Sequence, residues 1–242
     1  MSHEQTEQLL KNLHLRAMAE ALPAAIASAN KAQPSYNDFL LGLLQAQWHA
    51  RQETSLNWRI KQARIPEQWT LETFPFKQQP GISRRQVQDL ASLDFIPRSE
   101  NVVFVGQPGV GKTGLAIGLL LKALQNGHRG LFIRAQDLFD EMYSSLADRS
   151  TRHLLNRLAR LPVLLIDELG YLNLRPEQTN TFFKLMEERY GRVSTIITTN
   201  IEYDQWHAFL GAKAMVEALL SRLRHRCHTI HIKGPSLRHP TG

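Results

Sequence analysis

One stretch of eight residues limits the possible folds of this chain more than any other feature. Residues 106–113 read Gly-Gln-Pro-Gly-Val-Gly-Lys-Thr and match the phosphate-loop pattern GxxxxGK[ST] at every fixed position. The apolar run 102–105 precedes the loop and predicts a buried strand, and apolar residues at helical spacing follow it from Leu115 to Leu124. A chance glycine-rich turn would lack these flanks, so the pattern predicts a strand, a phosphate-binding loop and a helix.

The chemistry of this loop predicts the phosphates of a nucleotide as the ligand. Glycines let the backbone curl, so that N–H groups and the N-terminus of the following helix face an anion. We expect Lys112 to reach the β- and γ-phosphates and Thr113 to offer its hydroxyl to Mg²⁺. The predicted nucleotide-binding residues are Gly106, Gln107, Pro108, Gly109, Val110, Gly111, Lys112, Thr113, Gly114 and, from the tail, Arg238.

A pair of acids after a second apolar run indicates what the loop is for. The run 161–166 is typical of a parallel strand buried on both faces, and it ends in Asp167 and Glu168. Ligands of open α/β sheets bind at the carboxyl ends of the strands. We expect Asp167 to hold Mg²⁺, directly or through water, and Glu168 to polarise an attacking water. The alternative is an ordinary strand followed by a solvated acidic turn. The second acid favours hydrolysis over phosphoryl transfer by a metabolic kinase.

Composition narrows the class of protein. The 242 residues carry a formal charge of +7, which suggests a polyanionic partner. The single Cys227 excludes an internal disulfide framework and a multi-cysteine zinc site. No apolar run approaches the ~20 residues that span a membrane, and the polar N-terminus lacks the apolar core of a signal peptide. We expect a cytoplasmic protein without a membrane partner.

Three regions follow one another along the chain. Residues 1–64 predict a helical N-terminal domain for partner binding or self-assembly, although a simple helical extension of the core is the alternative. Residues 65–98 are rich in proline and predict a linker, in which 71–76 covers an adenine base or serves as an ordinary hydrophobic anchor. Residues 99–242 alternate strands and helices, which predicts an α/β fold with a five-stranded parallel sheet covered by helices on both faces. We expect the strands near 102–105, 130–133, 163–166, 194–198 and 228–232, and the helices near 112–125, 135–147, 149–160, 177–190 and 212–226.

Basic residues in the second half predict contacts with phosphates. On a helix over 149–160, the polar residues Arg149, Arg152, Asn156 and Arg160 share one face, and leucines share the other. We expect Arg149, Arg152 and Arg160 to bind DNA, and a solvated basic face is the alternative.

The last strands predict further contacts with the nucleotide. Asn200 ends a strand whose tip should lie between the phosphate loop and the acids, where its amide is able to orient water or touch the γ-phosphate. Arg222, Arg224 and Arg226 form the densest basic cluster, and an arginine supplied to a neighbour's γ-phosphate accelerates hydrolysis. A surface salt bridge or a DNA contact is the alternative for each arginine.

Taken together, these motifs resemble the IstB family, the ATPase helpers of insertion-sequence transposition, which are relatives of the helicase loader DnaC. The resemblance covers nearly the whole chain. It rests on segments in family order: 13–19, 35–40, 93–96, 100–102, 106–113, 166–171, 189–190 and 232–234.

The resemblance implies an AAA+ P-loop fold with strand order 5-1-4-3-2. It also implies ATP-dependent self-assembly into a homo-oligomer on duplex DNA, and delivery of that DNA to a partner transposase. It assigns Asn200 as sensor 1, Arg222 as the arginine finger and Arg238 as sensor 2. The sequence departs from the family at Ser221, Leu237 and Gly114, where an acid, an aromatic residue and often histidine are usual; the finger is therefore open between Arg222, Arg224 and Arg226.

Two other functions remain compatible with these residues. A helicase loader or replication initiator would share the ATPase core and differ in what its N-terminal region binds. A nucleotide-dependent DNA scaffold would bind ATP with negligible turnover, although the intact Glu168 argues against it.

Overall fold

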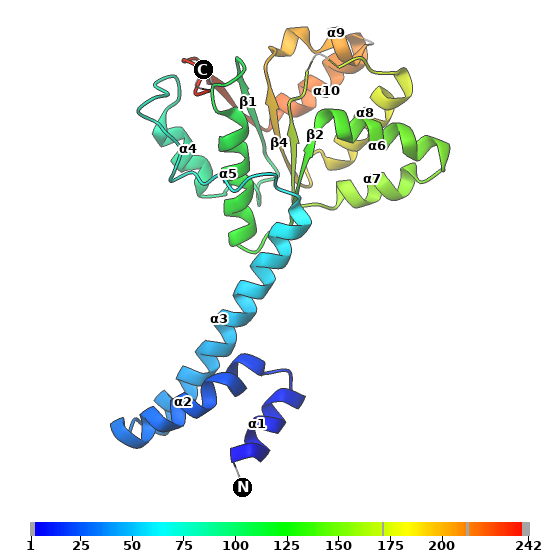
Figure 1. The fold of residues 1–242 in the computed structure, drawn as a ribbon. Helices are drawn as coiled ribbons and strands as arrows, with labels where there is room; N and C mark the ends of the chain where they lie inside the picture. The colour runs from blue at the N-terminus through cyan, green and yellow to red at the C-terminus, as the bar shows by residue number, and fades with distance from the viewer. Residues whose placement is uncertain (1–2, 171, 212, 239–242) are drawn as a thin grey trace. The chain divides into compact units, whose positions relative to one another are not determined.

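The computed structural model describes residues 3–170, 172–211 and 213–238 (Figure 1). The chain divides into two compact units, Met1–Trp58 and Arg59–Gly242. Across the described residues, no helix combines the length and apolar character needed to cross a membrane.

The first unit is built from helices. It contains α1 (His3–Asn12), α2 (Arg16–Ala32) and the larger part of α3 (Tyr36–Ala63). Its small core consists of Met18, Leu22 and Leu43. Much of the apolar stripe of α3 stays exposed in this unit, including Tyr36 and Trp48.

The second unit contains a parallel sheet. Its strands are β1 (Asn101–Gly106), β2 (Gly130–Arg134), β3 (Val163–Asp167), β4 (Ser194–Thr199) and β5 (Cys227–Ile232). They lie in the order β2-β3-β4-β1-β5 and every pair is parallel, which confirms the predicted fold class and strand order. The central strands β1, β3 and β4 are buried along nearly their whole length, as their continuous apolar runs require.

Helices cover both faces of this sheet (Figure 1). On one side α5 (Lys112–Gln125) contacts β1 to β4, and α4 (Arg84–Ala91) packs on α5. On the other side lie α6 (Ala135–Ala147), α7 (Thr151–Ala159), α8 (Pro176–Arg189) and α10 (Lys213–His225), with the short η1 (Tyr203–Gln205) and α9 (His207–Leu210) near the end of β4. Of the helix predicted over 212–226, residue 212 lies outside the described residues.

One predicted helix is shorter than expected. The basic segment forms a helix only from Thr151 to Ala159, so Arg149 precedes it and Arg160 is its C-cap. Arg149 has a φ of 61° in the turn after α6, a left-handed conformation that no helix continues. The carboxylate of Asp148 accepts a hydrogen bond from the Ser150 N–H at 2.9 Å and stabilises this turn.

Residues 65–98 pack onto α5 through two helix glycines. A β-carbon at Gly114 would lie 3.4 Å from the Trp69 ring, and one at Gly118 would lie 2.7 Å from Leu71 Cδ2. The absence of side chains at these two positions, one helical turn apart, leaves a groove that Trp69 and Leu71 occupy. The segment therefore lies along the first turns of the helix that follows the phosphate loop.

Candidate nucleotide-binding site

The phosphate loop connects β1 to α5 and has the shape that an anion requires. Gly109 and Gly111 have φ values of 83° and 95°, which side chains rarely tolerate. Lys112 begins α5, and its Nζ donates to the carbonyl oxygens of Gly106 at 2.8 Å and Gln107 at 2.9 Å. Burial lowers the pKa of Lys112, whereas the nearby charges of Asp167 and Glu168 raise it. The loop thus holds the ammonium group of Lys112 against its own curled backbone. The N-terminus of α5, which follows the loop, also favours negative charge.

Thr113 and Asp167 lie together beside this loop. Oδ1 of Asp167 accepts hydrogen bonds from the hydroxyls of Thr113 at 2.9 Å and Thr198 at 2.6 Å. Burial raises the pKa of Asp167, and these two hydroxyls lower it. A hydroxyl and a buried carboxylate are hard oxygen ligands, and a divalent cation between them would offset the cost of burying the charge. The residues therefore fit Mg²⁺.

Thr198 also holds the backbone of the second acid, a role that the sequence analysis missed. Glu168 has a φ of 59°, and its N–H donates to Thr198 Oγ1 at 2.9 Å. The fully buried Thr198 hydroxyl therefore joins both acids. The available signal was its position: Thr198 is a hydroxyl residue near the carboxyl end of β4, two residues before Asn200.

Asn200 lies against the turn that follows the two acids. Its Oδ1 is 2.9 Å from the point where a β-carbon of residue 170 would stand. Gly170 leaves room for this approach. The amide of Asn200 is thus brought to the edge of the sheet where Asp167 and Glu168 lie.

The C-terminal tail reaches the loop because β5 runs parallel to β1 and Ile232 pairs with Gly106. The Leu237 N–H donates to the Gly109 carbonyl at 2.8 Å. Arg238 is the next residue of the tail, and its positive charge is one of the smaller causes that lower the pKa of Lys112, after burial. The tail therefore belongs to the same site as the loop.

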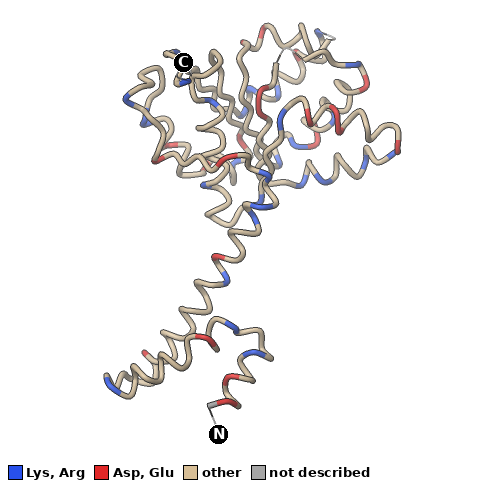
Figure 2. The backbone as a smooth tube through the Cα atoms, viewed as in Figure 1, with Lys and Arg blue, Asp and Glu red and all other residues tan. Residues whose placement is uncertain are grey.

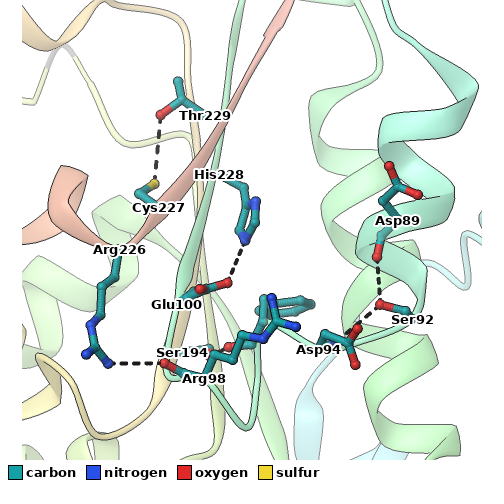
Figure 3. Close-up of polar contacts among 11 residues, drawn as sticks. Asp89, Ser92, Asp94, Arg98, Glu100, Ser194, Arg226, Cys227, His228 and Thr229 are labelled. Carbon is teal, nitrogen blue, oxygen red and sulfur yellow. Dashed lines mark hydrogen bonds and ion pairs between the residues drawn. The ribbon is translucent and has the colours of Figure 1, made fainter.

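The three candidate finger arginines lie elsewhere. Arg222 pairs with Glu187 at 3.5 Å, and the guanidinium of Arg224 lies 5.6 Å from the centre of the Tyr203 ring. Arg226 donates to the Arg98 carbonyl at 3.4 Å, as Figure 3 shows.

Arg222 and Arg226 lie near the start of β5, about the length of a strand from the loop, whereas Arg224 lines a pocket with Tyr203 and His231 farther along β5. β5 begins at Cys227 opposite Asn101, whereas the phosphate loop begins opposite Ile232. Five residues of strand separate the two ends by roughly 16 Å. Arg222 instead lines a cavity of about 430 Å³ between α8 and α10. The structure does not bring any of the three to the subunit's own phosphate loop.

The predicted DNA-binding arginines are exposed on and beside α7. Arg149, Arg152 and Arg160 are all exposed, and none has an ion-pair partner among the described residues. The neighbouring Arg157 pairs with Glu141. Figure 2 shows basic positions along this part of the chain. Only Arg152 lies within α7, and Arg149 and Arg160 lie just before and just after it. The three arginines therefore do not form a stripe on one face of a single helix.

Comparison with known proteins gives a match over nearly the whole chain. The family model of IstB-like ATP-binding proteins matches residues 8–241. An ATP-binding protein of insertion sequence IS21 from Pseudomonas aeruginosa is 39% identical over 232 residues, which are 96% of this chain and 88% of the relative. That of insertion sequence IS5376 from Geobacillus stearothermophilus is 34% identical over 97% of this chain and 94% of the relative.

Among solved structures, the DnaC helicase loader has a similar fold. The TM-score is 0.54 with 26% identity, over 62% of this chain and 88% of that chain. The shared fold is that of an AAA+ P-loop domain.

Proposed function

Because this chain belongs to the family of IstB-like ATP-binding proteins, we propose that it hydrolyses ATP, assembles on duplex DNA and assists a partner transposase. The observation that carries the ATPase proposal is the Thr113–Asp167–Thr198 hydroxyl–carboxylate cluster beside the phosphate loop, with Glu168 attached to the same threonine. A loop that only bound phosphate would not need a second acid with a fixed backbone.

The binding step uses the loop and the first turn of α5. Lys112 exchanges its bonds to the loop carbonyls for bonds to the β- and γ-phosphates of the substrate, so its charge is already at the right place. Thr113 and Asp167 would hold Mg²⁺, which supplies neutralisation of phosphate charge when bound. Arg238 adds a second cation from the tail.

The chemical step uses the two groups at the carboxyl ends of β3 and β4. Glu168 accepts a proton from the attacking water or polarises it, and Asn200 orients that water or the γ-phosphate. Thr198 keeps the Glu168 backbone in place.

Lys112→Ala should lose ATP binding, whereas Glu168→Gln should bind ATP and release phosphate slowly. Equal ATP affinity of the Lys112 variant, or normal turnover of the Glu168 variant, would refute the assigned roles.

We assign Arg222 to the active site of a neighbouring subunit. Its separation from the phosphate loop of its own chain supports action in trans, which makes a homo-oligomer part of the mechanism. Mixtures of Arg222→Ala and Lys112→Ala subunits should recover part of the ATPase activity, because one interface in the mixture pairs an intact loop with an intact arginine. Arg224→Ala and Arg226→Ala subunits are the matched controls for the choice of finger. No recovery in confirmed mixed assemblies would place the Arg222 role in doubt.

DNA binding is proposed for the three exposed arginines on and beside α7, which are Arg149, Arg152 and Arg160. Unpaired surface guanidinium groups bind phosphates without reading bases, so binding should be salt-sensitive and weakly sequence-specific. The double variant Arg149→Ala/Arg152→Ala should bind all duplexes more weakly and lose about one unit of log–log salt slope per lost contact. An Arg157→Ala variant is the control, since Arg157 is already paired with Glu141. Normal binding by the double variant would move the DNA path to the tail or the N-terminal helices.

The relatives favour transposition over helicase loading. Proteins of insertion sequences match almost the whole chain at up to 39% identity, whereas the helicase loader matches 62% of it at 26%.

We assign residues 1–64 to partner binding or self-assembly, 65–98 to a linker whose segment 71–76 lies at the adenine side, and 99–242 to the ATPase core. We place the protein in the cytoplasm, where ATP and duplex DNA are found. Co-purification with the transposase of the same insertion sequence, against a replicative helicase as the alternative bait, tests the choice.

A further inference from the structure

Gln79 is a fully buried polar residue that none of the motifs includes. Its Nε2 donates to the carbonyl of Val110 at 3.1 Å and to the carbonyl of Pro235 at 2.9 Å. Its Oε1 accepts from the Gly81 N–H at 3.4 Å. Its side-chain amide thus bonds to three segments: its own, the phosphate loop and the C-terminal tail.

Backbones meet directly around this amide. A β-carbon at Gly81 would lie 1.7 Å from the Lys233 carbonyl oxygen, and one at Gly234 would lie 1.6 Å from Gln79 Oε1. Contacts below about 3 Å are not tolerated, so neither glycine position accepts a side chain without movement. Segments 79–81 and 233–235 are therefore packed backbone against backbone, and the Gln79 side chain lies between them.

The tail also contacts the phosphate loop directly. The Leu237 N–H bonds to Gly109, and a β-carbon at Gly109 would lie 2.2 Å from Ser236 Oγ. Leu237 Cδ1 would lie 3.1 Å from a β-carbon at Gly111. The two loop glycines with left-handed backbones are thus the ones that the tail touches, and the next residue of the tail is Arg238.

We infer that Gln79 is a positioning residue, which couples the phosphate loop to Arg238 and so sets the preference of the site for ATP over ADP. The inference rests on the proposed nucleotide site. One planar amide bonds a loop carbonyl and a tail carbonyl, so a shift of Val110 on phosphate binding displaces Pro235 and changes the reach of Arg238. Without the amide, two carbonyls lose a buried donor and the tail loses its connection to the loop.

The experiment compares Gln79→Met with Gln178→Met. Gln178 is also buried, and it also uses Nε2 and Oε1, bonding Phe139 and Arg175 away from the loop. The affinities for ATPγS and ADP are measured by calorimetry with Mg²⁺ in wild type, both methionine variants, Arg238→Ala and Gln79→Met/Arg238→Ala. Residues in one hydrogen-bond network couple strongly, and we expect Gln79→Met to reduce the ATPγS-to-ADP affinity ratio by about tenfold.

The pattern across the variants separates coupling from a general loss of stability. Gln178→Met should lower the Tm and leave the affinity ratio at the wild-type value. Gln79→Met should change the ratio in the same direction as Arg238→Ala, and the double variant should show little further change. An unchanged ratio in Gln79→Met, or full additivity with Arg238→Ala, would overturn the inference.

A second measurement uses the wild-type chain and does not depend on the folding of a variant. Hydrogen exchange of the Leu237 amide, which bonds to Gly109, should differ between the ATPγS and ADP complexes. Identical exchange across residues 234–238 in both complexes would also overturn the inference. Failure of the proposed function looks different: in that case Lys112→Ala would leave the affinities for both nucleotides unchanged.

Discussion

Thr198→Val replaces one hydroxyl with a methyl group of similar size, and we expect it to weaken both folding and hydrolysis. The hydroxyl donates to the charged Asp167 at 2.6 Å and accepts from the Glu168 N–H at 2.9 Å. A hydrogen bond to a charged group contributes about 1.5–3 kcal/mol, and the ordinary, part-buried bond from the Glu168 N–H contributes about 0.5–1.5 kcal/mol. Relief from burying the hydroxyl itself offsets part of this sum.

The expected net loss of stability is therefore about 2–4 kcal/mol, which corresponds to a decrease in Tm of roughly 5–12 °C for a chain of this size. Thr198→Ser is the matched control. It keeps the hydroxyl and loses one methyl group, at a cost of about 1 kcal/mol. Thermal unfolding of the nucleotide-free proteins, followed by circular dichroism, measures the difference.

Hydrolysis provides an independent reading of the same contact. Without Thr198 Oγ1 the left-handed backbone of Glu168 loses its hydrogen bond, so kcat should fall at least about tenfold in the valine variant and much less in the serine variant. The Thr198 hydroxyl also lowers the pKa of Asp167 in the nucleotide-free protein, so its loss should raise that pKa. Equal Tm and equal kcat in the valine and serine variants would refute the bridging role.

Four further substitutions test the energetics of the fold. Burial raises the pKa of Asp167, so the ionised carboxylate lowers the stability of the folded protein at pH values above the ordinary pKa of aspartate. Asp167→Asn should therefore raise the Tm of the nucleotide-free protein at pH 7, and this gain should vanish as the pH falls toward about 4. The same variant should lose Mg²⁺-dependent phosphate release. Gly42→Ala should stabilise the chain by about 0.5–1 kcal/mol in urea unfolding because nothing lies within 4 Å of the added carbon, whereas Gly118→Ala should destabilise it by about 1–3 kcal/mol through its contact with Leu71. Arg189 is buried with its pKa lowered to about 9 by desolvation, and Arg189→Lys should cost about 2–3 kcal/mol in the same assay, because a single ammonium does not reproduce the bonds of the planar guanidinium to four separate acceptors.

The loop and the acids were predictable from the sequence because their signals are local. A glycine-rich loop between an apolar run and a helical pattern needs only neighbouring residues to be recognised, and so does an acid pair at the end of a buried strand. The alternation of such segments predicts the parallel sheet, since parallel strands require crossover helices. The strand order came from the family resemblance, because alternation alone does not specify which strands are neighbours.

Other features depend on contacts that no local pattern contains. The start of the basic helix was wrong because the helical periodicity of residues 149–160 does not show that Arg149 adopts a positive φ in the preceding turn. The glycines at 114 and 118 have a purpose only when Trp69 and Leu71 pack against them.

The sequence by itself determined which residues are candidates for the chemistry, and the tertiary structure decided which other residues hold those candidates in place. Lys112, Thr113 and Asp167 are recognisable as candidate ligands by their spacing, because a bound nucleotide with Mg²⁺ would require those groups at those positions. The supporting hydroxyl of Thr198 and the amide of Gln79 form hydrogen bonds with partners up to 156 residues away in the sequence. A threonine or glutamine makes such bonds only when folding brings a donor and an acceptor within about 3 Å and excludes water from both.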